Sequence, residues 1–425
     1  MKRYGPLAGA RGCVLAVVLS VGLVACGGGG SSSAEATTTP PVITTINNVQ
    51  PVVVDSGPSF NGQPIGANDE LFTTVTICVP GTSTCQSIDH VLVDTGSTGL
   101  RLLSAEIALT LPFVTDSGNN PIGNCVQYAD TTYQWGPIVK VDVKMAGEVA
   151  SSVPIQIAGA SNFAAAPTTC SAGGIPAQTV LELGANGILG VGLFRQDCGP
   201  GCASSAPPAV YFSCPATGCT ATSVALTSQL QNPVWMFPQD NNGLAILLPQ
   251  VGATGAVSVS GSMIFGIGTQ SNNGLGSAQA QGADNTGNFT TIFKGATYTT
   301  SYIDSGSSGL FFLDSTTTGL PNCSSSNGIT GFYCPASPVS FTAITSAPNP
   351  NGSGSTVSAN IAFSIANAVS LSNSPNTAFN NLGGPSGGPP PGVFDWGLPF
   401  FFGRTVFIGI EKQTSAAGTG PYWAY

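Results

Sequence analysis

The chain contains the segment Val91-Leu92-Val93-Asp94-Thr95-Gly96-Ser97-Thr98-Gly99-Leu100, and its pattern returns at Ser301-Tyr302-Ile303-Asp304-Ser305-Gly306-Ser307-Ser308-Gly309-Leu310. In each copy a hydrophobic strand runs into an aspartate, which is followed by a hydroxyl residue, glycine, serine, a second hydroxyl residue, glycine and leucine. We expect each strand to deliver one carboxylate into a tight turn, where glycine permits close approach and the hydroxyls hydrogen-bond the carboxylate. Two such turns facing each other would pair Asp94 with Asp304.

The composition indicates a mostly β protein. A chain of 425 residues with 42% hydrophobic content is long enough for two domains with cores of their own. Charged residues make up only 7%, whereas glycine, proline and hydroxyl residues are abundant, which favours short strands and many turns over long helices. The net charge of -9 and the pI near 4.3 argue against a basic face for phosphates, so we expect no nucleic-acid partner.

The N-terminus predicts export and lipid attachment. Basic residues precede an apolar run over 13–25, which is short for a membrane-spanning helix. The run ends in Leu23-Val24-Ala25-Cys26, which resembles the bacterial lipobox. Residues 1–26 are therefore expected to be a lipoprotein signal peptide, with Cys26 lipidated. An ordinary cleaved signal peptide with a chance cysteine is the alternative.

Residues 27–48 are rich in Gly, Ser, Thr and Pro and predict a flexible tether that forms no core. We expect a cell-envelope protein whose only membrane contact is the N-terminal lipid. In a cell with two membranes it would be held at the outer membrane or on the periplasmic face, and Gly27 after the cysteine is compatible with transport to the outer one.

Ten cysteines remain once Cys13 and Cys26 are set aside, an even number that predicts disulfides in an exported protein. Close spacing, and the pair left over, suggest Cys78–Cys85, Cys323–Cys334 and Cys125–Cys170. The alternatives of sequential pairing, nested pairing and a four-thiolate zinc site stay open for Cys198, Cys202, Cys214 and Cys219. An oxidising compartment favours disulfides, and we expect no metal.

The repeated motif resembles the two catalytic motifs of pepsin-like aspartic proteases, here in one polypeptide. The resemblance implies an all-β, two-lobed fold with a central cleft, the first lobe over 49–268 and the second over 269–425. It extends to the segment 128–136, which resembles the flap hairpin. Residues 187–192 resemble the strand that threads beneath the catalytic turn, and residues 261–266 resemble the strand that joins the lobes.

The chain also departs from the family pattern. In the flap segment Tyr128 matches the flap tyrosine, but Ala129 and Thr131 replace glycines. Residues 396–408 fit the second lobe's threading strand, yet Asp395 stands where a hydrophobic residue is usual. These departures put the details of the flap and of the last segment in doubt.

The implied activity is hydrolysis of peptide bonds in a polypeptide substrate, with no cofactor and with the chain as a monomer. Two carboxylates a few ångströms apart cannot both ionise cheaply, so Asp94 and Asp304 would share a proton and activate a water molecule. Because the two titrations are coupled, the residues do not tell which aspartate is the base.

The resemblance also implies roles for the neighbours of the pair. The hydroxyl after each aspartate would brace the two turns against each other, and the next serine would hydrogen-bond the outer carboxylate oxygen. The flap tyrosine would help to exclude water. The supporting residues expected at the site are Thr95, Gly96, Ser97, Ser305, Gly306, Ser307 and Tyr128.

Other mechanisms find little support. His90 is the single histidine, so a serine or cysteine nucleophile with a histidine base would depend on it alone. Alternation along the strand would let His90 approach the site, although a lone strand histidine is more often structural. The alternative function is a catalytically inactive lipoprotein of the same fold that binds peptide or glycan. The altered flap, Asp395 and the lack of a basic masking segment favour that alternative.

Overall fold

The computed structural model describes residues 48–172, 174–386 and 392–425. The expected signal peptide over 1–26, with Cys26, and all but the last residue of the tether over 27–48 lie outside the described residues. Among those described, helices are single turns and strands supply the scaffold, so the predicted all-β fold is confirmed. The helices are α1 (Thr168–Ser171), α2 (Val180–Leu183), α3 (Ser315–Thr318) and α4 (Ala368–Ser372), with 3₁₀ turns η1 (Ser104–Glu106), η2 (Gly199–Ala203), η3 (Leu226–Ser228), η4 (Val234–Met236), η5 (Ser325–Asn327) and η6 (Leu398–Phe400).

A large sheet of 16 strands in the described residues contains the first aspartate motif. Its strands follow the order β13 (Thr220–Ala221), β12 (Tyr211–Ser213), β7 (Ile122–Gln127), β8 (Thr132–Met145), β9 (Glu148–Ala158), β6 (Thr98–Leu103), β11 (Gly187–Val191), β5 (Cys85–Asp94), β4 (Leu71–Cys78), β1 (Val49–Val54), β15 (Val259–Phe265), β14 (Gly243–Leu248), β24 (Arg404–Gly409), β27 (Tyr422–Ala424) and β16 (Ala280–Gly282), with β10 (Ile175–Pro176) on β8. Three of these strands come from beyond residue 268, so this sheet ties the N-terminal part to the end of the chain.

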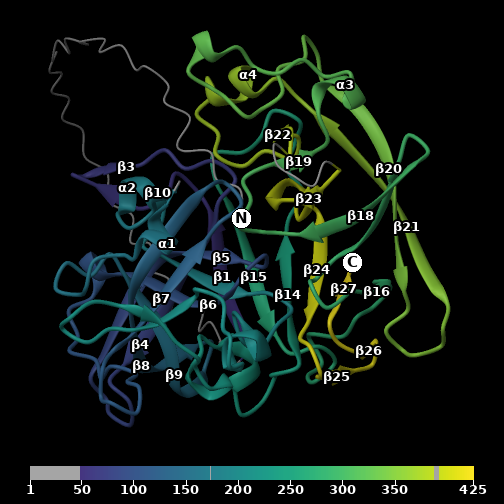
Figure 1. Cartoon of the computed structure of the whole chain (residues 1–425). Coiled ribbons are helices and arrows are strands. Elements are labelled where there is room, and N and C mark those ends of the chain that lie inside the picture. The colour runs from purple at the N-terminus through teal and green to yellow at the C-terminus, as the bar shows by residue number, and fades with distance from the viewer. Residues whose placement is uncertain (1–47, 173, 387–391) are drawn as a thin grey trace, which may run out of the picture.

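A second sheet of seven strands in the described residues contains the second aspartate motif. Its order is β21 (Thr356–Ile365), β20 (Val339–Pro348), β17 (Phe289–Phe293), β18 (Ala296–Ile303), β23 (Phe394–Trp396), β19 (Leu310–Phe312) and β22 (Gly383–Gly384). Two small ribbons pair β2 (Ser59–Phe60) with β3 (Gln63–Pro64) and β25 (Thr414–Ser415) with β26 (Gly418–Thr419). In Figure 1 the purple and blue strands gather on one side and β18 to β23 on the other, with β14 and β24 between them. The boundary expected at 268/269 stays a prediction.

The strand that carries Asp94 shows why these residues fold as they do. The last four residues of β5 are all buried, because β4 and β11 pair with its two edges and side chains pack on both faces. A strand covered on both faces is apolar without alternation, which explains the run Val91-Leu92-Val93. The largest apolar cluster includes Val93 from this strand and Ile303 and Trp396 from the second sheet, so it spans both parts of the molecule.

Five disulfides link the ten cysteines of the described residues. Their pairs are Cys78–Cys85, Cys125–Cys170, Cys198–Cys202, Cys214–Cys219 and Cys323–Cys334. The three pairs expected from spacing are confirmed, and the four cysteines left open pair sequentially. All four sulfurs are in disulfides and are therefore not thiolates, so the structure does not contain the four-thiolate zinc site.

Candidate active site

The two aspartate turns face each other across the junction of the sheets. Asp94 and Asp304 are both fully buried. The backbone N–H of Gly96 donates to Oδ1 of Asp94 at 2.9 Å and to Oδ1 of Asp304 at 3.2 Å. One N–H therefore lies within reach of both carboxylates, and the expected pairing of Asp94 with Asp304 is present in the structure.

The glycine after each hydroxyl residue lets the carboxylates come this close. A Cβ on Gly96 would lie 2.6 Å from Cγ of Asp304, and a Cβ on Gly306 would lie 2.7 Å from Cγ of Asp94. Each turn therefore leaves room for the carboxylate of the other turn. Any larger side chain at either glycine would push the pair apart.

The hydroxyls following the glycines hold the carboxylates from outside. Ser97 Oγ donates to Oδ2 of Asp94 at 2.5 Å, and Ser307 Oγ lies 2.8 Å from Oδ2 of Asp304. The N–H of Gly306 donates to Oδ1 of Asp304 at 2.8 Å. The carboxylates are thus oriented by the contacts expected for these serines.

A second set of hydrogen bonds ties the two turns together. Thr95 Oγ1 accepts from the N–H of Ser305 at 2.9 Å and donates to the carbonyl of Ile303 at 2.9 Å. Ser305 Oγ accepts from the N–H of Thr95 at 3.2 Å and donates to the carbonyl of Val93 at 2.7 Å. The two hydroxyls exchange matching bonds, so neither turn can shift without breaking bonds to the other.

Each turn is supported by a strand that passes beside it. β11 runs parallel to β5, and Gly190 pairs with Asp94. In the second sheet β23 runs parallel to β18, with Ile303 opposite Trp396. The second supporting strand is therefore only Phe394–Trp396. The expectation for 396–408 is corrected, because β24 leaves this position and pairs with β14 in the large sheet.

Burial and like charge give the two carboxyls different pKa values. Burial, together with the charge of Asp304, raises the pKa of Asp94 to about 7. Burial acts in the same direction on Asp304, while hydrogen bonds from Asp94, Ser307 and Gly306 lower its pKa, which lies below its ordinary value. The pair therefore shares one proton over a broad pH range.

The hairpin expected to act as a flap is formed by β7 and β8, with the turn at 128–131. Tyr128 is half-buried against the apolar cluster that contains Leu92, and its hydroxyl donates to Oε1 of Gln134 at 2.8 Å. The hairpin is also tied to a neighbouring segment, because the Cys125–Cys170 disulfide holds β7 and Ile175 donates its N–H to the carbonyl of Thr131 at 3.0 Å. The disulfide was expected from the sequence, but its restraint of this hairpin and the Ile175 contact were not.

A family model described as "Protein of unknown function (DUF3443)" matches residues 44–425. The chain belongs to the DUF3443 family. Among solved structures it is similar to the aspartic proteinase from Irpex lacteus, with 14% identity, 88% of this chain and 96% of that chain covered, and a TM-score of 0.45. No curated protein matches the chain. The chemistry proposed below rests on the contacts of the described residues.

A cavity of about 220 Å³ opens beside the first aspartate turn of this DUF3443 protein. Thr95, Gly96 and Ser97 line one part of it, and Tyr302 and Trp423 line another. Asp94 and Asp304 do not themselves line it, but residues of the turn form its wall, so a bound group would lie near the carboxylate pair. The cavity is the candidate place for part of a substrate.

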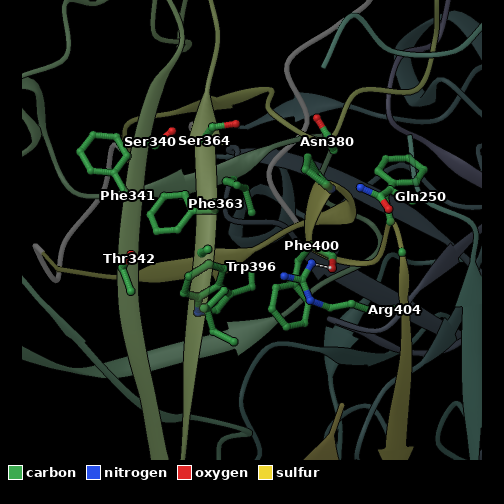
Figure 2. A pocket seen from close by; sticks show the side chains of 16 residues that line it. Gln250, Ser340, Phe341, Thr342, Phe363, Ser364, Asn380, Trp396, Phe400 and Arg404 are labelled. Atoms are coloured by element: carbon green, nitrogen blue, oxygen red, sulfur yellow. Dashed lines mark hydrogen bonds between the residues drawn. The ribbon is translucent and has the colours of Figure 1, made fainter. Parts of the chain in front are cut away.

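A second cavity, of about 650 Å³, lies in the C-terminal part of the molecule (Figure 2). Phe341 and Phe363 of the β20–β21 hairpin face Phe400, and Arg404 lies over the Phe400 ring with Cζ 4.5 Å from its centroid. No residue from Asp94 to Gly99 or from Asp304 to Gly309 lines this cavity. We therefore assign it no part in the chemistry of the pair.

Two site residues were not identified as such from the sequence. Tyr302 lines the cavity beside the first turn, and Asp395 hydrogen-bonds Ser307 at 2.8 Å. The signal for Asp395 was its departure from the apolar pattern, and the signal for Tyr302 was its alternation with Asp304 along β18. His90 contacts Asp55 and Asp89, and its ring packs edge-on against Phe72.

In the part of the chain that the structure describes, no group of three or more His, Cys, Asp or Glu side chains could hold a metal ion. No helix in that part is long and apolar enough to cross a membrane.

Proposed function

We propose that this DUF3443 protein is an aspartic endopeptidase in which Asp94 and Asp304 activate a water molecule for attack on a peptide bond. The observation that supports this most directly is the Gly96 N–H, which bonds both buried carboxylates at 2.9 and 3.2 Å. With one shared proton, the ionised carboxylate takes a proton from water, and the protonated carboxyl gives its own to the substrate.

The flanking contacts suit this chemistry. Serines hold the outer carboxylate oxygens, so the inner edges of both carboxyls face a common position. A water placed there would hydrogen-bond both groups without reorganisation of the turns. The cavity lined by Thr95, Gly96 and Tyr302 offers room for the substrate on one side of the pair.

The test is cleavage of an unstructured protein by the full-length chain, from acidic to neutral pH, with and without a transition-state-analogue inhibitor of aspartic proteases. Asp94→Asn and Asp304→Asn should each reduce kcat by about 10⁴-fold or more, because the two carboxyls act as a unit. Both variants should keep the circular dichroism spectrum of the wild type. Activity that survives either substitution would refute the proposal.

The second candidate function is peptide or glycan binding without turnover. The flap hairpin favours it, because the Cys125–Cys170 disulfide and the pairing of β10 with β8 restrain the element that would have to close over a substrate. In that case the folded wild type would show no cleavage at any pH but would bind extended peptides or oligosaccharides, and Asp94→Asn would leave the affinity within about twofold.

We also propose that the protein is held at the cell envelope by a lipid on Cys26. The support is the sequence alone, since the segment ending in Leu23-Val24-Ala25-Cys26 lies outside the described residues. Mass spectrometry of the N-terminal peptide from the natively expressed protein checks for the acyl chains. An unmodified N-terminus would contradict the anchor while leaving the peptidase proposal untouched.

A further inference from the structure

Asp395 places a third carboxylate beside the pair. It lies in β23, between β18 and β19, and only 2% of its surface is exposed. Burial of a carboxyl group is costly unless it is hydrogen-bonded. The hydrogen-bond partners of Asp395 therefore decide how this buried carboxyl is accommodated.

At the first aspartate turn, the position that corresponds to Asp395 is occupied by an apolar residue. By strand register, Asp395 pairs with Tyr302, two residues before Asp304. The corresponding pair in the first sheet is Ile188 with Leu92, two residues before Asp94, and both side chains are fully buried. An apolar pair at one turn is thus replaced by a tyrosine and an aspartate at the other, and these two hydrogen-bond each other.

Ser307 connects the third carboxylate to the pair. Its Oγ lies 2.8 Å from Oδ2 of Asp304 and 2.8 Å from Oδ2 of Asp395. A serine hydroxyl carries one proton and can donate it to only one of two oxygens. For both contacts to be hydrogen bonds, one of the two carboxyls must carry a proton and donate it to Ser307.

Two arrangements satisfy this requirement. In one, Asp395 is protonated and donates to Ser307, which donates to Asp304. In the other, Asp304 is protonated at Oδ2 and donates to Ser307, which donates to Asp395. A change from one arrangement to the other places one proton on Ser307 Oγ and removes another from it. A proton is thereby transferred between Asp395 and Asp304 without net gain or loss.

The titratable groups around Asp395 define the network. Asp304 and, beyond it, Asp94 lie on the side of Ser307, and Tyr302 faces Asp395 from β18. Burial, followed by the charges of Asp395 and Asp304, raises the pKa of the Tyr302 hydroxyl well above its ordinary value, so this group stays a donor. The neighbouring β19 and η6 contribute no titratable side chain.

We propose that Asp395 is a positioning residue that holds a second proton beside the Asp94/Asp304 pair through Ser307, and that its negative charge, once formed, makes the pair keep its shared proton to higher pH. The shared proton is the one that the active form needs. For its effect on turnover this inference rests on the proposed peptidase function, whereas its proton-binding part does not.

The test uses the full-length protein and two substitutions. Asp395→Asn keeps the shape and a hydrogen bond to Ser307 but cannot ionise, and Asp395→Ile copies the residue at the corresponding position of the first turn. Glu182→Gln is the control, because it also converts an acid to an amide but on the exposed face of α2. The Asp395→Asn variant keeps the test valid if the Asp395→Ile variant does not fold.

The first measurement follows the aspartate carboxyl signals by ¹³C NMR between about pH 3 and pH 9. In Asp395→Asn we expect the higher ionisation of the Asp94/Asp304 pair to move down by about 1 pH unit, since a nearby negative charge has been removed. The Glu182→Gln control should move it by less than about 0.2 units. A pair that titrates as in the wild type in both Asp395 variants would overturn the inference.

The second measurement is the pH profile of kcat/KM, whose alkaline limb should shift down by the same amount in Asp395→Asn. A shift in the NMR titration with no cleavage by the wild type would refute the peptidase proposal and keep the inference. Cleavage by the wild type with an unshifted titration and an unshifted alkaline limb would refute the inference and keep the peptidase.

Discussion

Burial is what distinguishes Asp94 and Asp304 from the surface carboxylates at the level of single residues. Asp116, which is only partly buried, accepts hydrogen bonds from Ser213 and Asn120 that hold its pKa at about 2. Asp94 also accepts hydrogen bonds, yet burial and the neighbouring charge raise its pKa to about 7. The same type of side chain therefore serves as a fixed anion in one place and as a proton carrier in the other.

The raised pKa of Asp94 makes stability depend on pH. The folded chain binds this proton up to about pH 7, whereas the unfolded chain releases it near the ordinary value of 3.8. The stability that the proton contributes is fully present below about pH 4 and is lost as the pH rises through 7. The lowered pKa of Asp304 acts in the opposite sense but below its ordinary value of 3.8, outside this window.

Asp94→Asn should therefore remove a pH-dependent loss of stability. We expect the free energy of unfolding of the variant to rise relative to that of the wild type by about 4 kcal/mol between about pH 4 and about pH 8, because asparagine does not titrate. Urea unfolding at a series of pH values measures both proteins under the same conditions. A difference between them that stays constant with pH would show that Asp94 has an ordinary pKa.

At the scale of the structural element, the turns after β5 and β18 bring the two carboxylates together only if the glycine in each turn has no side chain. Gly96 lies between its own aspartate and the one from the other turn, and the supporting strands β11 and β23 leave the turn no room to withdraw. A Cβ on Gly397, for example, would lie 2.1 Å from the carbonyl oxygen of Gly309. Strand, turn and supporting strand thus form one rigid unit in each half.

Gly96→Ala tests this unit. Its methyl group would lie 2.6 Å from Cγ of Asp304, so the two carboxylates must separate. We expect kcat/KM to fall by about 100-fold or more and stability by about 1–3 kcal/mol. Gly252→Ala is the matched control, because a Cβ there meets nothing within 4 Å. Equal activity of the two variants would mean that the carboxylates need not be this close.

At the scale of the whole molecule, the two aspartate motifs meet because the large sheet and the reciprocal bonds of Thr95 and Ser305 hold the halves in one arrangement. β24 and β27 return from the second half into the first sheet, as Figure 1 shows. The apolar cluster that contains Val93 and Ile303 is continuous between the halves. The geometry of the aspartate pair is therefore a property of the joined halves.

Thr95→Val tests the connection between the halves. The substitution keeps the shape but removes the hydroxyl that accepts from Ser305 and donates to Ile303. A buried N–H and a buried carbonyl are left without partners, so we expect a loss of stability of about 2–4 kcal/mol and a clear loss of turnover. Thermal unfolding and the peptide-cleavage assay measure both effects. Unchanged stability would show that other contacts carry the connection.

Sequence patterns predicted the local parts of this structure well. The strand, the turn and the contact of Ser97 with Asp94 lie within a few consecutive residues, and so does the Cys78–Cys85 disulfide. Local spacing also predicted the hairpin of β7 and β8, but not that the Cys125–Cys170 pair and β10 restrain it. The strand expected over 396–408 was wrong in extent, because an apolar run does not tell which sheet it will join.

What the sequence determined by itself is the pair of turns, since each is specified by its own glycines and hydroxyls and by the apolar strand before it. Only the tertiary structure decided that Ser307 would lie between Asp304 and Asp395, which is 88 residues further along the chain. The register of β23 against β18 sets that contact. Strand register depends on packing across the whole sheet, and a linear pattern contains no record of it.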